Sequence, residues 1–189
     1  SSTLTDFFEE YPPTIFLSDT SVIDGAFRYY PNENYIYKYD VNNTEDWDWK
    51  GVDISVESQT TSKLAHSIQY YTIHKILGEY DFVFDDDDTG EIADIVAIKN
   101  IGDSVLVIDL FHCKYCPKKD GVANPGARID DVYQVVGQAE KSVKWFADKE
   151  KLILRLMDRE RGRLKNGKAS RIEKGKFEDL IHLAKIARY

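Results

Sequence analysis

The segments that decide the fold are GEIADIVAI, residues 90–98, and VLVIDLFHCK, residues 105–114. Each contains a short, nearly continuous run of β-branched and large apolar residues, which is typical of a strand covered on both faces. The residues between the two runs, Asn100 to Asp103, have turn character. The sequence therefore predicts two neighbouring strands, at 92–98 and 105–111, joined by a tight turn.

Helical patterns lie on both sides of this strand pair. Ser62 is positioned to cap a helix that Gly78 would end. Further helices are expected where apolar residues recur at helical spacing, at 129–147, 149–161 and 177–189. The first of these three carries Val132, Val136, Ala139, Val143 and Phe146 along one stripe.

The N-terminal part of the chain has a different character. Residues 14–17 and 26–30 are rich in aromatic and β-branched residues and predict a hairpin around a turn at 18–25. Another strand is expected at 35–39, and a short one at 82–84. We therefore expect an α/β protein with a β-rich extension over residues 1–58 and a core over residues 59–189.

Composition limits the class of protein. The 189 residues are 42% hydrophobic and 31% charged, which indicates a globular chain. No apolar run approaches the length of about 20 residues that crosses a membrane, and residues 1–6 lack the pattern of a signal peptide. The two cysteines, Cys113 and Cys116, are too few for a disulfide scaffold. These features predict a cytoplasmic protein.

Charge is distributed unevenly along the chain. The net charge is -8, but residues 1–60 hold 3 Lys/Arg against 12 Asp/Glu and residues 149–176 hold 11 against 4. The basic segment is expected to contact phosphate groups, although a basic helix can also be only a solvated face. The candidate phosphate-binding residues are Arg128, Arg155, Arg159, Arg163, Lys165, Lys168 and Arg171.

Several tempting motifs fail. Residues 162–168 have the spacing of a phosphate-binding loop, but Ala169 stands where the magnesium-binding hydroxyl belongs. The acidic run from Asp85 to Asp88 begins like a calcium loop but lacks its closing glutamate, since Val96 occupies that position. One Cys-x-x-Cys pair, Cys113 and Cys116, cannot complete a zinc site.

The pattern that survives joins the two central strands. Asp94 lies early in the first, and His112 and Lys114 end the second, where alternation places them on one face and Asp109 on the other. Oxygen ligands suit Mg²⁺ or Mn²⁺, and a neighbouring lysine can stabilise negative charge that builds up at a phosphate. The alternative is structural, with Asp94 capping a turn and Lys114 extending into solvent.

These residues resemble the PD-(D/E)xK nuclease superfamily, in which an aspartate on one strand and an acid-x-lysine on the next flank a metal. The resemblance rests on residues 90–94 and 112–114 and on the helices before and after them. It implies a restriction-endonuclease-like mixed sheet flanked by helices. Gln134 and Gln138 resemble the glutamine-containing helix that many of these nucleases place beside the site.

A narrower resemblance extends over most of residues 12–175. Residues 47–53, 67–69, 84–87, 112–114 and 125–128 look like a domain carried by bacterial superfamily-2, DEAD/DEAH-type helicases. This implies a helicase domain in the same parent protein and a role in defence or DNA processing.

One position departs from the superfamily pattern, because His112 replaces the usual acid. Imidazole ligates Mn²⁺ better than Mg²⁺. Glu91 is the expected compensating ligand, with Asp109, Glu57 and Gln69 as alternatives.

The resemblance implies metal-dependent cleavage of phosphodiester bonds in DNA, with RNA as an open alternative substrate. Asp94 and Glu91 would hold the metal, and His112 would be a further ligand or a base. Lys114 would position water or stabilise charge, and Gln134 and Gln138 would orient the site or touch the nucleic-acid backbone. One rival is a degenerate domain that binds nucleic acid without cutting it. The other is a protein-interaction module that uses the acidic N-terminal part.

Overall fold

The computed structural model describes residues 3–5, 8, 14–16, 21–30, 41–102, 105–126 and 129–187. The chain divides into two compact units, Ser1–Trp47 and Asp48–Tyr189. The division lies before the boundary expected at residue 58. Residues 53–59 belong to the second unit because they form hydrogen bonds with later residues of that unit. The Cys116 amide, for example, donates to the Ile54 carbonyl at 2.7 Å.

The N-terminal unit contains a three-stranded antiparallel sheet of β1 (Thr14–Phe16), β2 (Val22–Asp24) and β3 (Phe27–Tyr29). The hairpin prediction was therefore incomplete, because the expected turn at 18–25 contains β2. Its apolar residues Val22 and Ile23 favour a strand, and Gly25, with φ of 57°, lies in the turn that follows. The strand expected at 35–39 lies outside the described residues.

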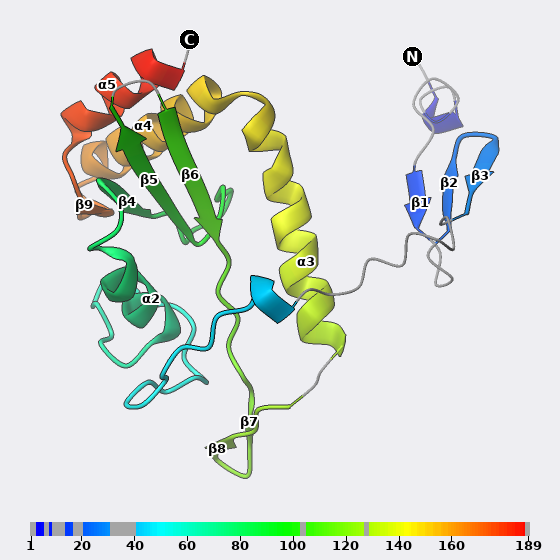
Figure 1. Ribbon diagram of the computed structural model, residues 1–189, viewed down its shortest axis with the longest axis horizontal. Coiled ribbons are helices and arrows are strands. Elements are labelled where there is room, and N and C mark those ends of the chain that lie inside the picture. Colours follow the sequence, from blue (N-terminus) through cyan, green and yellow to red (C-terminus); the bar gives the residue numbers. More distant parts are fainter. Residues whose placement is uncertain are drawn as a thin grey trace. The chain divides into compact units, whose positions relative to one another are not determined.

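The second unit is built on a four-stranded sheet in the order β6-β5-β4-β9 (Figure 1). Its strands are β4 (Phe82–Asp85), β5 (Ile95–Ile101), β6 (Val105–Phe111) and β9 (Ile172–Lys174). The α/β class is confirmed. All three strand pairings are antiparallel, however, so the expected mixed sheet is wrong. Short connections between β4, β5 and β6 reverse the chain each time.

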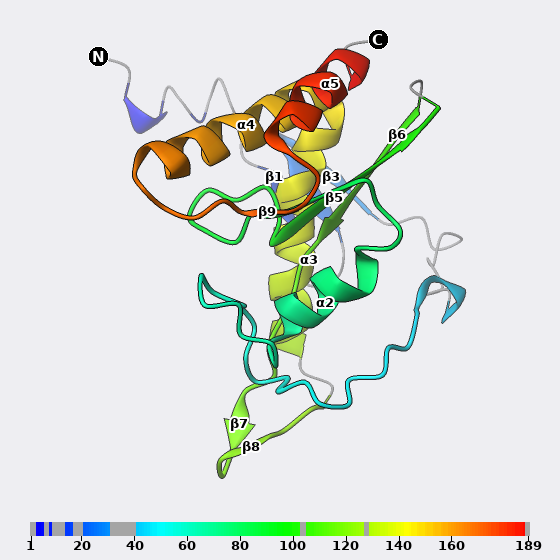
Figure 2. The same cartoon turned by 90° about the vertical axis from the view of Figure 1, so that its left-hand side faces the viewer.

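Two helices cover one face of this sheet. They are α4 (Lys149–Lys165) and α5 (Phe177–Ala187), which lie side by side in Figures 1 and 2. The core joins Phe84 and Val96 of the sheet to Leu152, Leu156 and other apolar residues of α4 and α5. Val83, Ile95 and Ala97 alternate with the strand residues of this core and are also fully buried, so the opposite face is covered too.

The helix before the sheet, α2 (Ile68–Ile76), is shorter than expected. Its N-cap is Ser67, whose hydroxyl accepts from the Tyr70 amide, so the prediction that Ser62 caps it is wrong. Residues 60–66 form turns instead, with Thr60 and Lys63 at positive φ. Leu77 is the C-cap and immediately precedes Gly78, the expected end.

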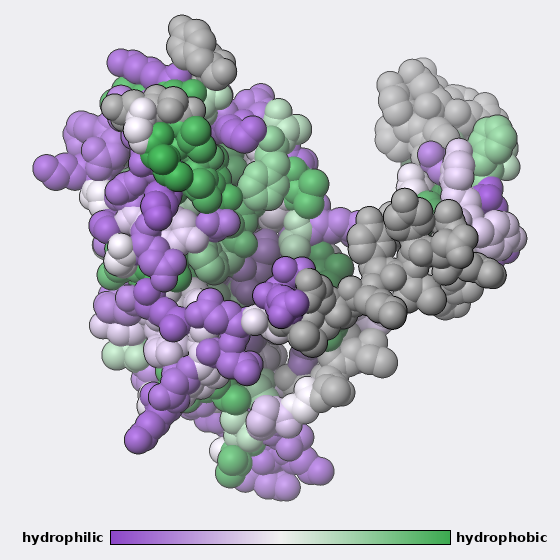
Figure 3. All heavy atoms as spheres, viewed as in Figure 1, coloured by the Kyte–Doolittle hydropathy of each residue, from purple (hydrophilic) through white to green (hydrophobic). Residues whose placement is uncertain are grey.

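The remaining elements are short, apart from one helix. They are the 3₁₀ turns η1 (Val41–Asn43) and η2 (Lys144–Ala147), the small hairpin of β7 (Lys118–Lys119) and β8 (Val122–Ala123), and the helix α3 (Ile129–Val143). The apolar stripe of α3 is exposed at Val132, Val136 and Val143, and apolar side chains are visible there in Figure 3. None of the described helices is long and apolar enough to cross a membrane.

Candidate metal centre

Three carboxylates converge in the connection between β4 and β5. Asp87, Glu91 and Asp94 each place one carboxylate oxygen within 4.8 Å of the other two. Asp94 is buried, whereas Asp87 and Glu91 are partly exposed. Carboxylate oxygens are ligands that suit Mg²⁺ and Mn²⁺. The structure thus brings together two of the predicted metal ligands, Glu91 and Asp94.

Local hydrogen bonds fold the connection so that these groups meet. The Asp86 amide donates to the Asp94 carbonyl at 2.9 Å, which closes the loop at its base. The Asp86 carboxylate accepts from the Ile92 amide at 2.7 Å, and Gly90 takes a positive φ of 78° that reverses the chain. Residues 92–94 therefore belong to the loop, and β5 begins at Ile95 and not at the expected residue 92.

Asp94 lies at the junction of the two central strands. Because Ile95 pairs with Phe111, Asp94 stands opposite His112. Its Oδ2 accepts from the Cys113 amide at 2.8 Å and lies 3.5 Å from Nδ1 of His112. The prediction that Asp94 lies beside His112 is confirmed. Asp109 points elsewhere, since its carboxylate accepts from the Tyr80 hydroxyl at 2.7 Å.

The contacts of His112 favour one assignment of the ring proton. Ser142 Oγ donates to the Ile92 carbonyl at 2.5 Å, and a hydroxyl has only one proton to give. The Gln138 carbonyl is a second acceptor at 3.0 Å, but the shorter contact favours Ile92. With the proton on either carbonyl, the contact of 3.0 Å between Ser142 Oγ and His112 Nε2 has Nε2 as the donor. This assigns a lone pair to Nδ1 in the neutral ring.

That lone pair points at a carboxylate. His112 Nδ1 is buried without a hydrogen-bond partner among the described residues, and only 6% of the side chain is exposed. A lone pair facing Asp94 at 3.5 Å is unfavourable unless a second proton or a cation lies between them. The orphaned Nδ1, 3.5 Å from Asp94, fits a metal ligand beside the carboxylates.

Lys114 is held by Glu57 at the edge of the cluster. Its Nζ lies 3.6 Å from Glu57 Oε2, which also accepts from the Tyr115 amide at 2.8 Å. The next residue, Ser58, donates to Asp87 Oδ2 at 2.5 Å. Lys114 and the carboxylates are thus connected through residues 57 and 58, which precede α2.

Burial and mutual repulsion affect the acids of this loop. The pKa of Glu91 is raised first by burial and then by the charges of Asp94 and Asp87. Burial also raises the pKa of Asp86 to about 6, even though Arg159 opposes this shift. A cation among the three converging carboxylates would remove the repulsion between them.

A pocket of about 220 Å³ opens beside the cluster, lined by Glu91, His112, Gln138, Lys141 and other residues. Gln138 Oε1 is buried there without a hydrogen-bond partner among the described residues. Gln134 is exposed and does not line this pocket. Of the two glutamines expected beside the site, the structure therefore places Gln138 there.

The predicted phosphate-binding residues divide into two sets. Arg155, Arg159, Arg163 and Arg171 all contact residues 85–90, at the end of β4 and in the β4–β5 connection. Lys165 and Lys168 lie near the end of α4 and are exposed. Arg128 lies outside the described residues. Phosphate binding stays a prediction; Lys165, Lys168 and Arg155 are the exposed candidates.

The sequence reasoning did not assign Asp87 or Ser142 to the site. The acidic run 85–88 was a signal for Asp87, but the run itself does not reveal which aspartate faces the cluster. Ser142 carries no local signal, because a serine on a polar helix is ordinary. Glu57 was only one of several alternatives.

Comparisons with known proteins give no family for this chain. No protein-family model matches it, and no match was found among curated proteins or solved structures.

Proposed function

We propose that the chain is a divalent-cation-dependent nuclease domain that hydrolyses phosphodiester bonds in DNA. The observation that carries this proposal is the meeting of three carboxylates, one of which, that of Asp94, lies 3.5 Å from the orphaned Nδ1 of His112. The PD-(D/E)xK resemblance of the same residues supports it.

The candidate ligands suit a divalent cation that prefers oxygen ligands and also accepts a nitrogen ligand. Asp87, Glu91 and Asp94 would supply oxygen ligands, and His112 would supply Nδ1, which favours Mn²⁺ over Mg²⁺. Bound there, a divalent cation supplies Lewis-acid polarisation of the phosphate and lowers the pKa of a coordinated water. Ser142, which contacts Nε2, would hold the imidazole in the tautomer that this role needs.

Other residues of the chain would act on the substrate. Lys114, oriented by Glu57, would donate to a phosphate oxygen on which negative charge builds up. Gln138 would offer its amide to the substrate from the adjoining pocket. The exposed Lys165 and Lys168 would attract the DNA backbone. A helicase domain of the same parent protein, as the resemblance implies, would supply the DNA strand.

One observation favours a second candidate function, in which the domain binds nucleic acid without cutting it. Lys114 pairs with Glu57 rather than with one of the three converging carboxylates, and His112 replaces the usual acid. In this function the lysine would contribute charge to binding but not to catalysis.

The test is an incubation of labelled single- and double-stranded DNA with Mn²⁺, Mg²⁺ or EDTA. We expect Mn²⁺-supported cleavage that EDTA abolishes, that Asp94→Asn and Lys114→Ala both remove, and that the control Asp109→Asn leaves unchanged. Asp109 is a suitable control because its carboxylate lies on β6 but bonds to Tyr80.

The outcomes separate the two candidate functions. Cleavage by Asp94→Asn at the parental rate would refute the assignment of the site. DNA binding by the parent protein without cleavage under any metal would favour the second candidate.

A further inference from the structure

The β4–β5 connection that carries the carboxylates is held on its other side by arginines. Arg159, on α4, forms an ion pair with the buried Asp86 carboxylate. The same guanidinium donates to the Asp86 carbonyl at 2.9 Å and to the Thr89 carbonyl at 3.0 Å. Only 12% of its side chain is exposed. The guanidinium therefore binds the backbone and one side chain of this loop.

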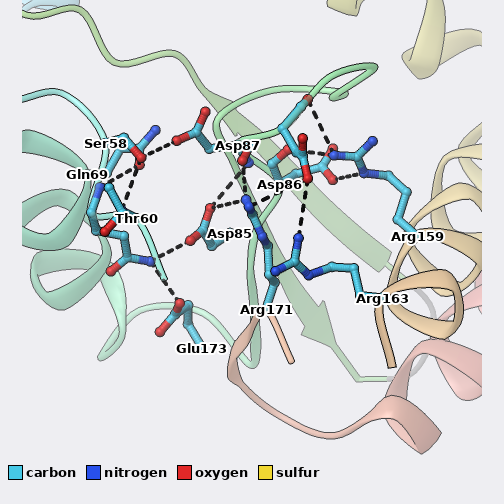
Figure 4. A network of polar contacts seen from close by, with 12 residues as sticks. Ser58, Thr60, Gln69, Asp85, Asp86, Asp87, Arg159, Arg163, Arg171 and Glu173 are labelled. Carbon is cyan, nitrogen blue, oxygen red and sulfur yellow. Dashed lines mark hydrogen bonds and ion pairs between the residues drawn. The ribbon is translucent and has the colours of Figure 1, made fainter. Parts of the chain in front are cut away.

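Arg171 reaches the same loop from the start of β9. Its Nη1 donates to the Asp87 carbonyl and lies 3.2 Å from Asp85 Oδ1. Its own carbonyl accepts from the Asp85 amide at 2.9 Å. Arg171 therefore bonds directly to the backbone of a candidate metal ligand. Figure 4 shows Arg159 and Arg163 on one side of the aspartates, Ser58 and Gln69 on the other, and Arg171 reaching in among the aspartates.

The consecutive aspartates thus have different tasks. Asp86 uses one carboxylate oxygen for Arg159 and the other for the Ile92 amide, so it links the arginine to the residue after Glu91. Asp87 turns its carboxylate the other way, where Ser58 donates to it. Fixing the loop from the arginine side leaves the carboxylates of Asp87 and Glu91 facing Asp94.

We propose that Arg159 and Arg171, together named the arginine clamp, are positioning residues for the candidate metal centre. The inference rests on the proposed function, because it concerns the same site. Three like charges within 4.8 Å repel one another, so a flexible loop would spread them apart. The planar fork of arginine holds several carbonyls in one geometry, which the single ammonium of lysine does not reproduce.

The test measures Mn²⁺ affinity by calorimetry in the full chain, without substrate. Arg159→Lys and Arg171→Lys keep the charge but lose the fork. We expect each to weaken Mn²⁺ binding by about 10- to 100-fold, as loss of groups that orient metal ligands typically does. The matched control is Arg161→Lys, since Arg161 lies exposed on α4 and contacts Asp158 and the Phe177 ring.

A second readout separates positioning from general stability. In cleavage assays, the Mn²⁺ concentration for half-maximal rate should rise in both clamp variants, while the rate at saturating Mn²⁺ returns towards the parental value. Thermal unfolding shows whether each variant is folded at the assay temperature. If one variant unfolds, the other gives the result.

Each outcome decides a different point. Parental Mn²⁺ affinity in a folded clamp variant overturns the clamp but leaves the proposed function standing. An equal loss in Arg161→Lys also overturns it, because the effect would then be general. Absence of Mn²⁺ binding in the parent protein overturns both proposals.

Discussion

Removal of the Ser142 hydroxyl should weaken metal binding, although every proposed metal ligand is kept. In Ser142→Ala, the buried His112 Nε2–H and the Ile92 carbonyl each lose the partner that the hydroxyl supplied. A buried polar group left without a partner costs about 1–3 kcal/mol. The imidazole can escape this cost by moving its proton to Nδ1, where Asp94 would accept it. That change removes the lone pair that a metal needs.

The expected loss of metal affinity follows from this shift of the ring proton from Nε2 to Nδ1. Loss of a group that orients a ligating histidine typically lowers metal affinity by about 10- to 100-fold. This corresponds to about 1.4–2.8 kcal/mol, which agrees with the cost of one unsatisfied buried group. The free energy of unfolding of the metal-free protein should fall by about 1–3 kcal/mol as well.

The assay is calorimetric titration with Mn²⁺ of the parent protein, Ser142→Ala and Val143→Ala. Val143 is a suitable control, because it is the next residue on α3 and its side chain is 60% exposed. Urea unfolding shows that each variant is folded at the assay temperature. A folded Ser142→Ala with parental Mn²⁺ affinity would refute the assigned tautomer and the ligand role of His112.

Other outcomes test the fold and the surface. Burial raises the pKa of the Cys113 thiol to about 12, so iodoacetamide at pH 8 should leave it unmodified in the native protein but not in denaturant, as peptide mapping would show. Gly175→Ala should lower stability in urea more than Gly167→Ala. Both glycines have positive φ, which costs alanine about 1–2 kcal/mol, but only at Gly175 would the new Cβ meet a ring carbon of β4 at 2.7 Å. Equal losses would contradict this reasoning. Replacing Lys165 and Lys168 by glutamate should make the plot of log binding constant against log salt concentration less steep, by about 0.9 per lost phosphate contact on duplex DNA. An unchanged slope would show that the two lysines do not contact phosphate.

Local patterns were sufficient to predict β6 and most of β5, although β5 begins at Ile95 and not at residue 92. The apolar runs specify β5 and β6, and their short separation in the sequence limits which residues can lie opposite each other. This is why the proximity of Asp94 and His112 could be predicted from spacing alone.

Features that depend on distant partners could not be predicted in this way. The basic segment suggested phosphate contacts, but Arg159 and Arg171 find their partners in a loop more than 70 residues earlier in the chain. The stripe on α3 correctly indicated a helix, yet periodicity does not show whether a neighbour covers it. The start of α2 was misplaced because Ser62 and Ser67 are equally plausible caps by residue type, and only the backbone conformation distinguishes them.

The pairing of β9 with β4 has a consequence for the order of events during protein synthesis. Residue 84 pairs with residue 172, so the strand that completes this edge of the sheet emerges from the ribosome long after the acidic loop. Until then Asp87 lacks the bond from Arg171 to its backbone. Under the proposed function, a nascent chain would carry all of its metal ligands but not their final arrangement. Translation itself would thus delay DNA cleavage until nearly the whole domain has been made.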